Sequence, residues 1–126
     1  MGHEIIFLIG DFTARIGDPT DKLSPRQPLT PEEIKENLKT FRKQAGRILK
    51  FAGENRVQIK FNSKWLSKMT TADWLGIFQK FTVQQMIQRD MFQDRMRENK
   101  PVGLHEFLYP LMQGYDSVAL DVDGEL

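Results

Sequence analysis

The pattern of apolar and polar residues predicts two short strands. Residues 5–9 form a continuous apolar run that ends at Gly10, which is the pattern of a strand covered on both faces. A strand of this kind belongs to a parallel sheet, yet the chain offers few other strands to pair with it. Residues 57–61 alternate between apolar and polar, which predicts a half-buried second strand. Residues 10–29 contain two glycines and three prolines and are expected to form a loop.

A helix is predicted to begin after Thr30. Thr30 and Glu33 match the capping box, and Pro31 occupies the first helical position, which suits proline. Apolar residues then recur every three or four positions along one stripe: Ile34, Leu38, Phe41, Ala45, Ile48 and Leu49. We expect this helix to end at Gly53, because glycine often terminates helices.

Short helices are predicted between residues 62 and 99. Thr70 or Thr71 is expected to cap the first of them, and Thr82 the second. Asp90 is expected to open the third, because acidic residues are favoured in the first turn of a helix. Most of this part of the chain is therefore helical.

A last helix is predicted to start at Leu104. At 100° per residue, several apolar side chains gather around one direction: Phe107, Leu108, Leu111, Tyr115 and Val118. Tyr109, Gln113 and Asp116 fall together on the flank of that face, roughly 130° away. Their spacing places a phenol, an amide and a carboxylate on consecutive turns, where they could meet one small polar ligand. On spacing alone, a stripe of this kind is more often solvated surface.

Composition narrows the class of protein. The 126 residues, 14.7 kDa in mass, suffice for one domain with its own core, and the net charge of +1 gives no overall attraction to nucleic acid. The absence of cysteine excludes disulfides, and two histidines make a histidine-rich metal site unexpected. No apolar stretch approaches the roughly 20 residues that span a bilayer. We expect no membrane association and a cytoplasmic location.

Two further features have ordinary interpretations when each is taken alone. The turn from Gly10 to Gly17 matches neither the phosphate-binding Walker pattern nor the dinucleotide fingerprint. A basic stretch, formed by Arg42, Lys43, Arg47 and Lys50, fits the solvated face of a helix better than a nucleic-acid site. Neither feature alone indicates a function.

Three segments, taken together, resemble one enzyme family. They are Ile-Gly-Asp-Phe-Thr-Ala-Arg-Ile-Gly-Asp-Pro-Thr at 9–20, Phe-Asn-Ser-Lys-Trp-Leu at 61–66, and the predicted helix at 104–120. Their order and spacing are similar to those of tyrosyl-tRNA synthetases, over essentially the whole chain. The resemblance implies an α/β fold that is mostly helical: a partial Rossmann-like class I synthetase catalytic domain with few strands and a helical insertion.

The resemblance also implies roles for single residues. In this family the acid of the Gly-Asp-Pro turn, here Asp18, holds the α-ammonium of tyrosine with help from Tyr109 and Gln113. Asp116 corresponds to the acid that accepts the substrate phenol hydroxyl, and Thr13 to the turn threonine that lines the pocket. A buried acceptor of this kind rejects phenylalanine, because without the hydroxyl the acid is left unpaired.

The same resemblance divides the chain into parts of a single partial catalytic domain. Residues 1–29 hold the strand and Gly-Asp-Pro turn, residues 30–100 the helical connective insertion, and residues 101–126 the pocket helix and following segment. The family's dimer contacts imply an interface at Leu104, Phe107, Leu108 and Leu111. A homodimer or higher oligomer is also expected because an apolar strand edge without neighbours tends to associate.

The ATP-binding motifs of class I synthetases are not found in these 126 residues. The His-Ile-Gly-His type is expected before residue 1, and the Lys-Met-Ser-Lys-Ser type beyond residue 126. We therefore expect a part of a tyrosine–tRNA ligase, in which ATP and Mg²⁺ activate tyrosine for transfer to tRNA. This chain would contain no catalytic residue and no cofactor, and would be inactive alone. The alternatives are a non-catalytic dimerisation module and an independent tyrosine-binding domain.

Overall fold

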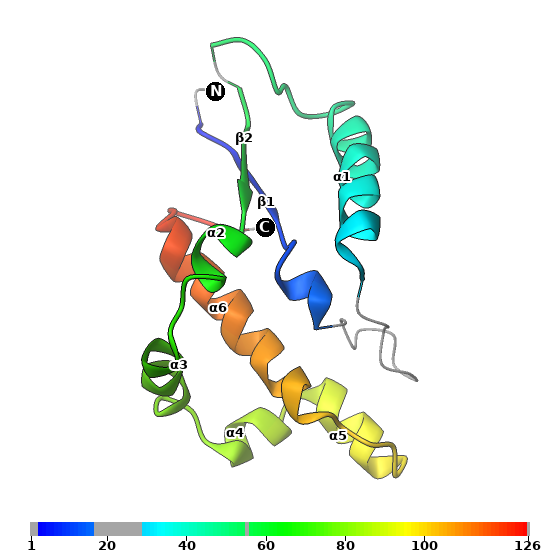
Figure 1. Cartoon of the computed structure of the whole chain (residues 1–126), viewed down its shortest axis with the longest axis vertical. Helices are drawn as coiled ribbons and strands as arrows, with labels where there is room; N and C mark the ends of the chain where they lie inside the picture. Colours follow the sequence, from blue (N-terminus) through cyan, green and yellow to red (C-terminus); the bar gives the residue numbers. More distant parts are fainter. Residues whose placement is uncertain (1–2, 17–28, 55, 126) are drawn as a thin grey trace.

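The computed structural model describes residues 3–16, 29–54 and 56–125, and it confirms the mostly helical α/β class (Figure 1). The elements, in chain order, are β1 (Ile6–Ile9), η1 (Thr13–Arg15), α1 (Pro31–Ala45), β2 (Gln58–Phe61), α2 (Ser63–Leu66), α3 (Thr71–Phe78), α4 (Val83–Ile87), α5 (Asp90–Arg97), η2 (Leu104–Phe107) and α6 (Leu108–Leu120). The η elements are single 3₁₀ turns.

The two predicted strands pair in parallel. Ile6 lies opposite Gln58 and Ile9 opposite Phe61, with α1 in the connection between the strands. All four residues of β1 are half-buried, so the prediction of a strand covered on both faces is wrong for the described part of the chain. The physical reason is that this sheet has two strands, and each keeps one edge without a described strand beside it.

The capping box of α1 is confirmed. The Thr30 hydroxyl accepts a hydrogen bond from the backbone N–H of Glu33 at 3.2 Å, and the Glu33 carboxylate accepts one from the Thr30 N–H at 2.8 Å. The predicted end at Gly53 is wrong, because α1 already stops at Ala45 with Gly46 as its C-cap. Glycine is unfavourable inside a helix, and a prediction from apolar periodicity alone does not take Gly46 into account.

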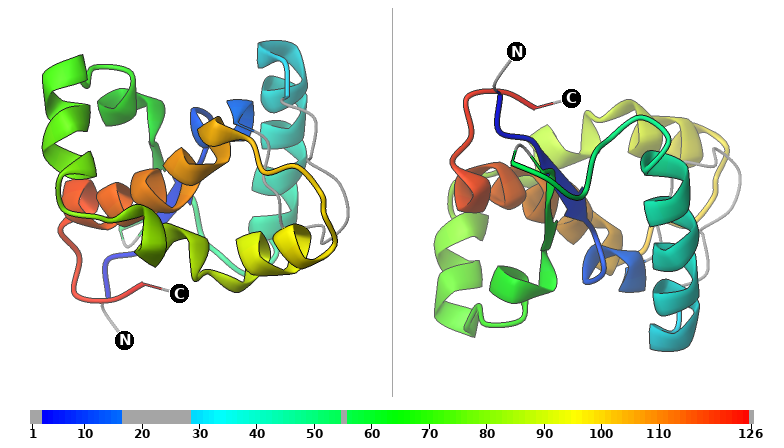
Figure 2. Two further views of the ribbon diagram at one scale, coloured as in Figure 1. Left: turned by 90° about the horizontal axis from the view of Figure 1, so that it is seen from below. Right: turned by 90° about the horizontal axis from the view of Figure 1, so that it is seen from above.

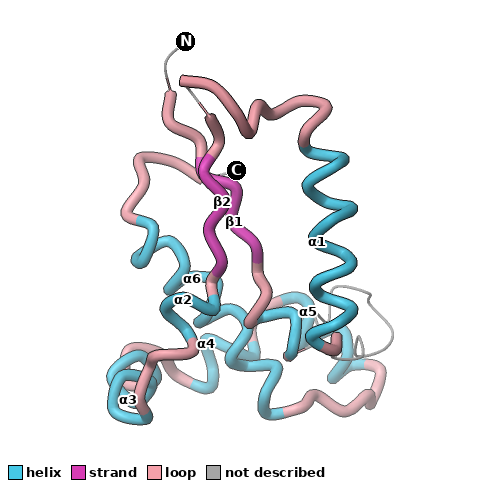
Figure 3. The backbone as a smooth tube through the Cα atoms, turned by 45° about the horizontal axis from the view of Figure 1, so that its top comes forward, coloured by secondary structure: helices cyan, strands magenta, loops and turns pink. Residues whose placement is uncertain are grey.

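The helices lie on both sides of the sheet (Figures 1 and 2). Helix α1 lies on one side and α6 crosses the other, while α3, α4 and α5 lie beyond the carboxyl ends of the strands (Figure 3). Thr70 caps α3 and Thr82 caps α4, and α5 begins at Asp90, as predicted. None of the helices in the described ranges is long and apolar enough to cross a membrane.

The buried side of helix α6 overlaps the predicted apolar face but is wider than it. Of the predicted apolar face, Leu111 is buried, Val118 is 70% exposed and the others are half-buried. Met112 and Asp116, which were not predicted on that face, are buried as well. The buried face therefore includes a carboxylate. Hydrogen bonds to the carboxylate make this burial possible. The pattern of apolar residues along the helix could not predict them.

A buried ion pair joins α5 to the segment before α6. The Arg95 guanidinium donates to the Glu106 carboxylate and to the carbonyl of Pro101, and both charged side chains are almost fully buried. The Gly103 N–H also donates to Glu106, at 2.7 Å. These bonds close the turn between α5 and η2 and so fix where α6 begins.

Candidate functional site

Asn62 connects the two strands to α6. It follows β2 directly and is fully buried. Its Oδ1 accepts from the Phe12 N–H at 3.0 Å, and its Nδ2 donates to Thr13 Oγ1 at 3.2 Å and to Asp116 Oδ2 at 3.1 Å. Because a backbone N–H can only donate, the Phe12 contact fixes which end of the amide faces Asp116.

A second donor holds the Asp116 carboxylate. The indole Nε1–H of Trp65, in α2, donates to Asp116 Oδ1 at 2.7 Å. From the described residues, each carboxylate oxygen thus accepts one hydrogen bond, while an ionised carboxylate offers about four acceptor positions in all. Asp116 retains the capacity to accept a hydrogen bond from a ligand.

Asp116 faces a cleft of about 1040 Å³. One wall is formed by the N-terminal segment and β1, together with Gln58 and Lys60, and the other by Gln113, Asp116 and the end of α6. The segment after α6, residues 121–125, completes the lining, and Figure 2 shows it beside the N-terminal segment. Acidic side chains outnumber basic ones along the cleft, which favours a ligand with a cationic group.

Burial raises the pKa of Asp116 above 3.8, although the hydrogen bonds from Asn62 and Trp65 oppose the shift. The negative charge of Glu125 adds to the rise in this pKa. Among the described residues no cation pairs with the carboxylate, which depends on these two neutral donors. Its protonation is therefore sensitive to the loss of either one.

We predict that the pKa of Asp116, followed by ¹³C NMR of the side-chain carboxyl, lies above 3.8. Trp65→Phe should raise it further, because one hydrogen bond to the charged form is lost. Since the folded chain then binds this proton more tightly than the unfolded chain, the contribution of Asp116 to the free energy of unfolding falls as the pH rises from 3.8 through the folded pKa. A midpoint at or below 3.8 in the wild type would contradict this.

The structure brings together part of the predicted set of tyrosine-binding residues. Gln113 and Asp116 line the cleft, and Thr13 is joined to Asp116 through the Asn62 amide. Tyr109 is half-buried on the same helix and does not line the cleft. Asp18 lies outside the described residues.

Asn62 and Trp65 lie in the segment 61–66 that resembles the family, but the sequence predicted a role for neither. A signal for Asn62 was present, because a polar residue directly follows the second predicted strand. Parallel strands end at the same edge of a sheet, so Asn62 had to lie near the turn after Gly10. Nothing in the spacing indicated Trp65.

The four residues predicted at a dimer interface differ in their exposure. Leu104 is exposed, Phe107 and Leu108 are half-buried, and Leu111 is buried within the chain. The Phe107 ring packs on Phe92, with 4.8 Å between the ring centroids. Leu104 is therefore the member of this set most available to a partner, and the interface remains a prediction.

Gly10→Ala is predicted to destabilise the hydrogen-bond network of the site, although Gly10 does not line the cleft. A Cβ at this position would lie 2.5 Å from Thr13 Oγ1, a separation that displaces the hydroxyl bonded to Asn62. We expect urea denaturation to show a loss of about 1–3 kcal/mol in the free energy of unfolding. Gly114→Ala is the control, because no atom lies within 4 Å of its Cβ and alanine suits a helix better. Equal effects of the two changes would contradict the steric argument.

Comparison with known proteins gives these contacts a context. The family model for tRNA synthetases class I (W and Y) matches residues 1–126. The tyrosine–tRNA ligase of Carboxydothermus hydrogenoformans is 51% identical over 126 residues, which cover all of this chain and 30% of that protein. The tyrosine–tRNA ligase of Coxiella burnetii is 52% identical over the same length, 31% of that protein. The chain therefore spans about a third of the length of these relatives.

A solved structure agrees with the sequence comparisons. A C-terminally truncated mitochondrial tyrosyl-tRNA synthetase of Aspergillus nidulans superposes with a TM-score of 0.73 and 26% identity, over 94% of this chain and 37% of that one. The family model, the relatives and the fold agree. The chain belongs to the class I (W and Y) tRNA synthetases and, among them, to the tyrosine–tRNA ligase family.

Proposed function

We propose that this chain forms part of the tyrosine-binding site of a tyrosine–tRNA ligase, the enzyme that activates tyrosine with ATP and transfers it to tRNA. The observation that supports this most directly is the Asp116 carboxylate, which is buried at the cleft and held by Asn62 and Trp65. In this proposal Asp116 accepts a hydrogen bond from the phenol hydroxyl of tyrosine.

This arrangement can distinguish tyrosine from phenylalanine. Two donors hold the carboxylate in one orientation, so it cannot turn away when a ligand without a hydroxyl enters the cleft. Phenylalanine would displace water from the carboxylate without replacing its hydrogen bond. A site of this kind can reject the analogue that lacks the hydroxyl by about 10⁴–10⁵-fold.

The α-ammonium group of tyrosine needs acceptors at the other end of the ligand. Gln113 is exposed on the cleft and offers its amide oxygen. We propose that Asp18 and Tyr109, which the family resemblance assigns to the α-ammonium, complete this contact, for which Tyr109 must turn toward the cleft because its side chain is not part of the lining. The chain's own residues then bind and orient tyrosine, while ATP and Mg²⁺ supply the activation chemistry in the whole enzyme.

An exchange of segments tests the proposal. The part of the C. hydrogenoformans ligase that matches this chain would be replaced with these 126 residues, and tyrosine-dependent ATP–pyrophosphate exchange would be measured. We expect the chimera to be active and its Asp116→Ala variant to lose tyrosine-dependent exchange. Lys68→Ala, on an exposed lysine away from the cleft, is the control. Unchanged exchange in the Asp116→Ala chimera would refute the role of Asp116.

We also propose that the isolated chain associates with itself. Large apolar side chains on and near α3, α4 and η2 are exposed: Leu75, Phe78, Phe81, Val83 and Leu104. Sedimentation equilibrium should show a dimer or larger species, and Leu104→Glu should weaken it. A wild-type monomer that binds no hydrophobic dye would contradict this prediction.

A further inference from the structure

Charge is distributed unevenly along this nearly neutral chain. Residues 39–60 contain seven of the 18 lysines and arginines but one of the 17 acids, Glu54, so their net charge is +6. The remaining residues have 11 basic and 16 acidic side chains, a net charge of −5. Such asymmetry in a protein of net charge +1 indicates an anionic partner for the positive part.

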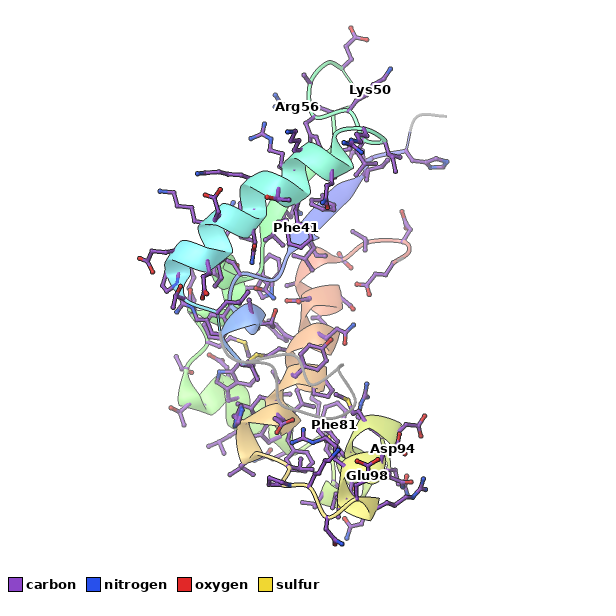
Figure 4. All side chains as sticks on the ribbon, turned by 90° about the vertical axis from the view of Figure 1, so that its right-hand side faces the viewer. Phe41, Lys50, Arg56, Phe81, Asp94 and Glu98 are labelled. Atoms are coloured by element: carbon purple, nitrogen blue, oxygen red, sulfur yellow. The ribbon has the colours of Figure 1, made fainter. Side chains whose placement is uncertain are left out.

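The fold gathers this charge at one end of the molecule. The surface named here the basic end consists of five exposed residues: Arg42, Lys43, Arg47, Lys50 and Arg56. A hydrogen bond of 2.8 Å from the Val57 N–H to the Lys50 carbonyl turns the loop after α1 back on itself. Figure 4 shows Lys50 and Arg56 beside each other on this loop, with Asp94 and Glu98 at the opposite end.

The dipole of α1 accounts for the positions of only two of these five basic residues. Arg42 and Lys43 lie in the last turn of α1, where positive charge stabilises the helix dipole. Arg47, Lys50 and Arg56 lie beyond the helix and have no such role. In the part of the chain that the structure describes, none of the five residues forms a salt bridge with an acid. Within the described residues, acids therefore do not neutralise this positive charge by ion pairing.

We infer that the basic end binds the phosphate backbone of RNA. The choice of RNA rests on the proposed function, because a tyrosine–tRNA ligase acts on tRNA. Five exposed cations on a helix end and a projecting loop can each meet a phosphate, and such contacts position an RNA without reading its sequence.

An anionic membrane surface is the less suitable partner. A helix that lies on a membrane needs a wide apolar face turned outward beside its basic residues. In α1 the apolar side is used within the fold, with Ile34 buried and Leu38 lining the groove beside β1. Phe41 in α1 is 54% exposed and Ile48 beyond it is 88% exposed, but two separate side chains do not form the wide apolar face that a membrane-bound helix needs.

Fluorescence anisotropy with labelled bulk bacterial tRNA tests this inference on the 126-residue chain. The test variant is Arg47→Glu/Lys50→Glu/Arg56→Glu, and the matched control is Lys68→Glu/Lys80→Glu/Arg89→Glu, which changes the net charge equally at exposed positions elsewhere. We expect the test variant to bind tRNA at least about tenfold more weakly than the control. The slope of log K against log salt should become shallower by about 2 in the test variant, since each phosphate contact contributes roughly 0.7–0.9.

Three results would overturn the inference: equal weakening by the two triple variants, no tRNA binding by the wild type, or binding to phosphatidylglycerol vesicles in its place. Titration of the same preparations with L-tyrosine separates this inference from the proposed function. If none of the preparations binds tyrosine, but the test variant still binds tRNA more weakly than the control, the proposed function alone is refuted. If the preparations bind tyrosine, but the test variant and the control bind tRNA equally well, the inference alone is refuted.

Discussion

Replacing Arg95 with methionine is expected to lower the free energy of unfolding by about 3–5 kcal/mol, as measured by urea denaturation. The change leaves the Glu106 carboxylate buried, with the Gly103 N–H as its one remaining donor among the described residues. It also removes the donor that holds the Pro101 carbonyl. An uncompensated buried charge costs more than the pair itself contributes, so the loss of one partner is severe.

The double variant Arg95→Met/Glu106→Gln should recover a large part of this loss, because no unpaired charge then remains in the core. Arg97→Met is the control, since the Arg97–Asp94 pair is exposed and its removal should cost less than about 1 kcal/mol. A loss below about 1 kcal/mol for Arg95→Met, or no recovery in the double variant, would contradict a structural role for the pair.

The same pair predicts a dependence of stability on pH. Burial alone would raise the pKa of Glu106, but the hydrogen bonds from Arg95 and Gly103 and the positive charge of Arg95 hold it below 4.5. Because the folded pKa is depressed, the stabilisation by Glu106 is present above pH 4.5 and is lost as the pH falls through the folded pKa. The stability difference between the wild type and Glu106→Gln should shrink over that range.

Replacing Asp116 with alanine is expected to remove most of the preference for tyrosine over phenylalanine. Without the carboxylate, the phenol hydroxyl has no acceptor there, and the two amino acids should bind within about tenfold of each other. The change also leaves Asn62 Nδ2 and Trp65 Nε1 without their acceptor, at about 1–3 kcal/mol for each buried donor. Circular dichroism must therefore show that the variant is folded before its binding is compared by calorimetric titration.

Trp65→Phe separates the role of the carboxylate in binding from its role in the fold. This variant keeps an aromatic ring and removes the donor that lies 2.7 Å from Asp116 Oδ1. We expect weaker tyrosine binding and unchanged phenylalanine binding, because the orientation of Asp116 matters for the ligand with a hydroxyl. Equal losses for both ligands would mean that Trp65 serves only the packing of the cleft.

The parts of the fold that the sequence predicted correctly depend on local signals. Thr30, Thr70 and Thr82 each cap a helix through a residue three positions further along the chain. The two strands appear directly in the apolar runs. A signal confined to a few neighbouring residues can be recognised without knowledge of the tertiary structure.

The parts that were missed depend on contacts between distant segments. Asp116 is 54 positions from Asn62 and 51 from Trp65, so periodicity within the last helix could not show why a carboxylate faces the core. The predicted apolar face of that helix was therefore incomplete, because it left out the buried residues Met112 and Asp116. Family resemblance identified Asp116 as a site residue, whereas the residues that hold it became visible only in the structure.

The most direct test of the proposed site is calorimetric titration of the purified chain with L-tyrosine, with L-phenylalanine as the matched control. We predict saturable binding of tyrosine and much weaker binding of phenylalanine, because Asp116 is fixed to accept one hydroxyl. Equal binding of the two amino acids would contradict the role of Asp116. Absence of heat with both would show that these residues do not form a tyrosine site in this chain.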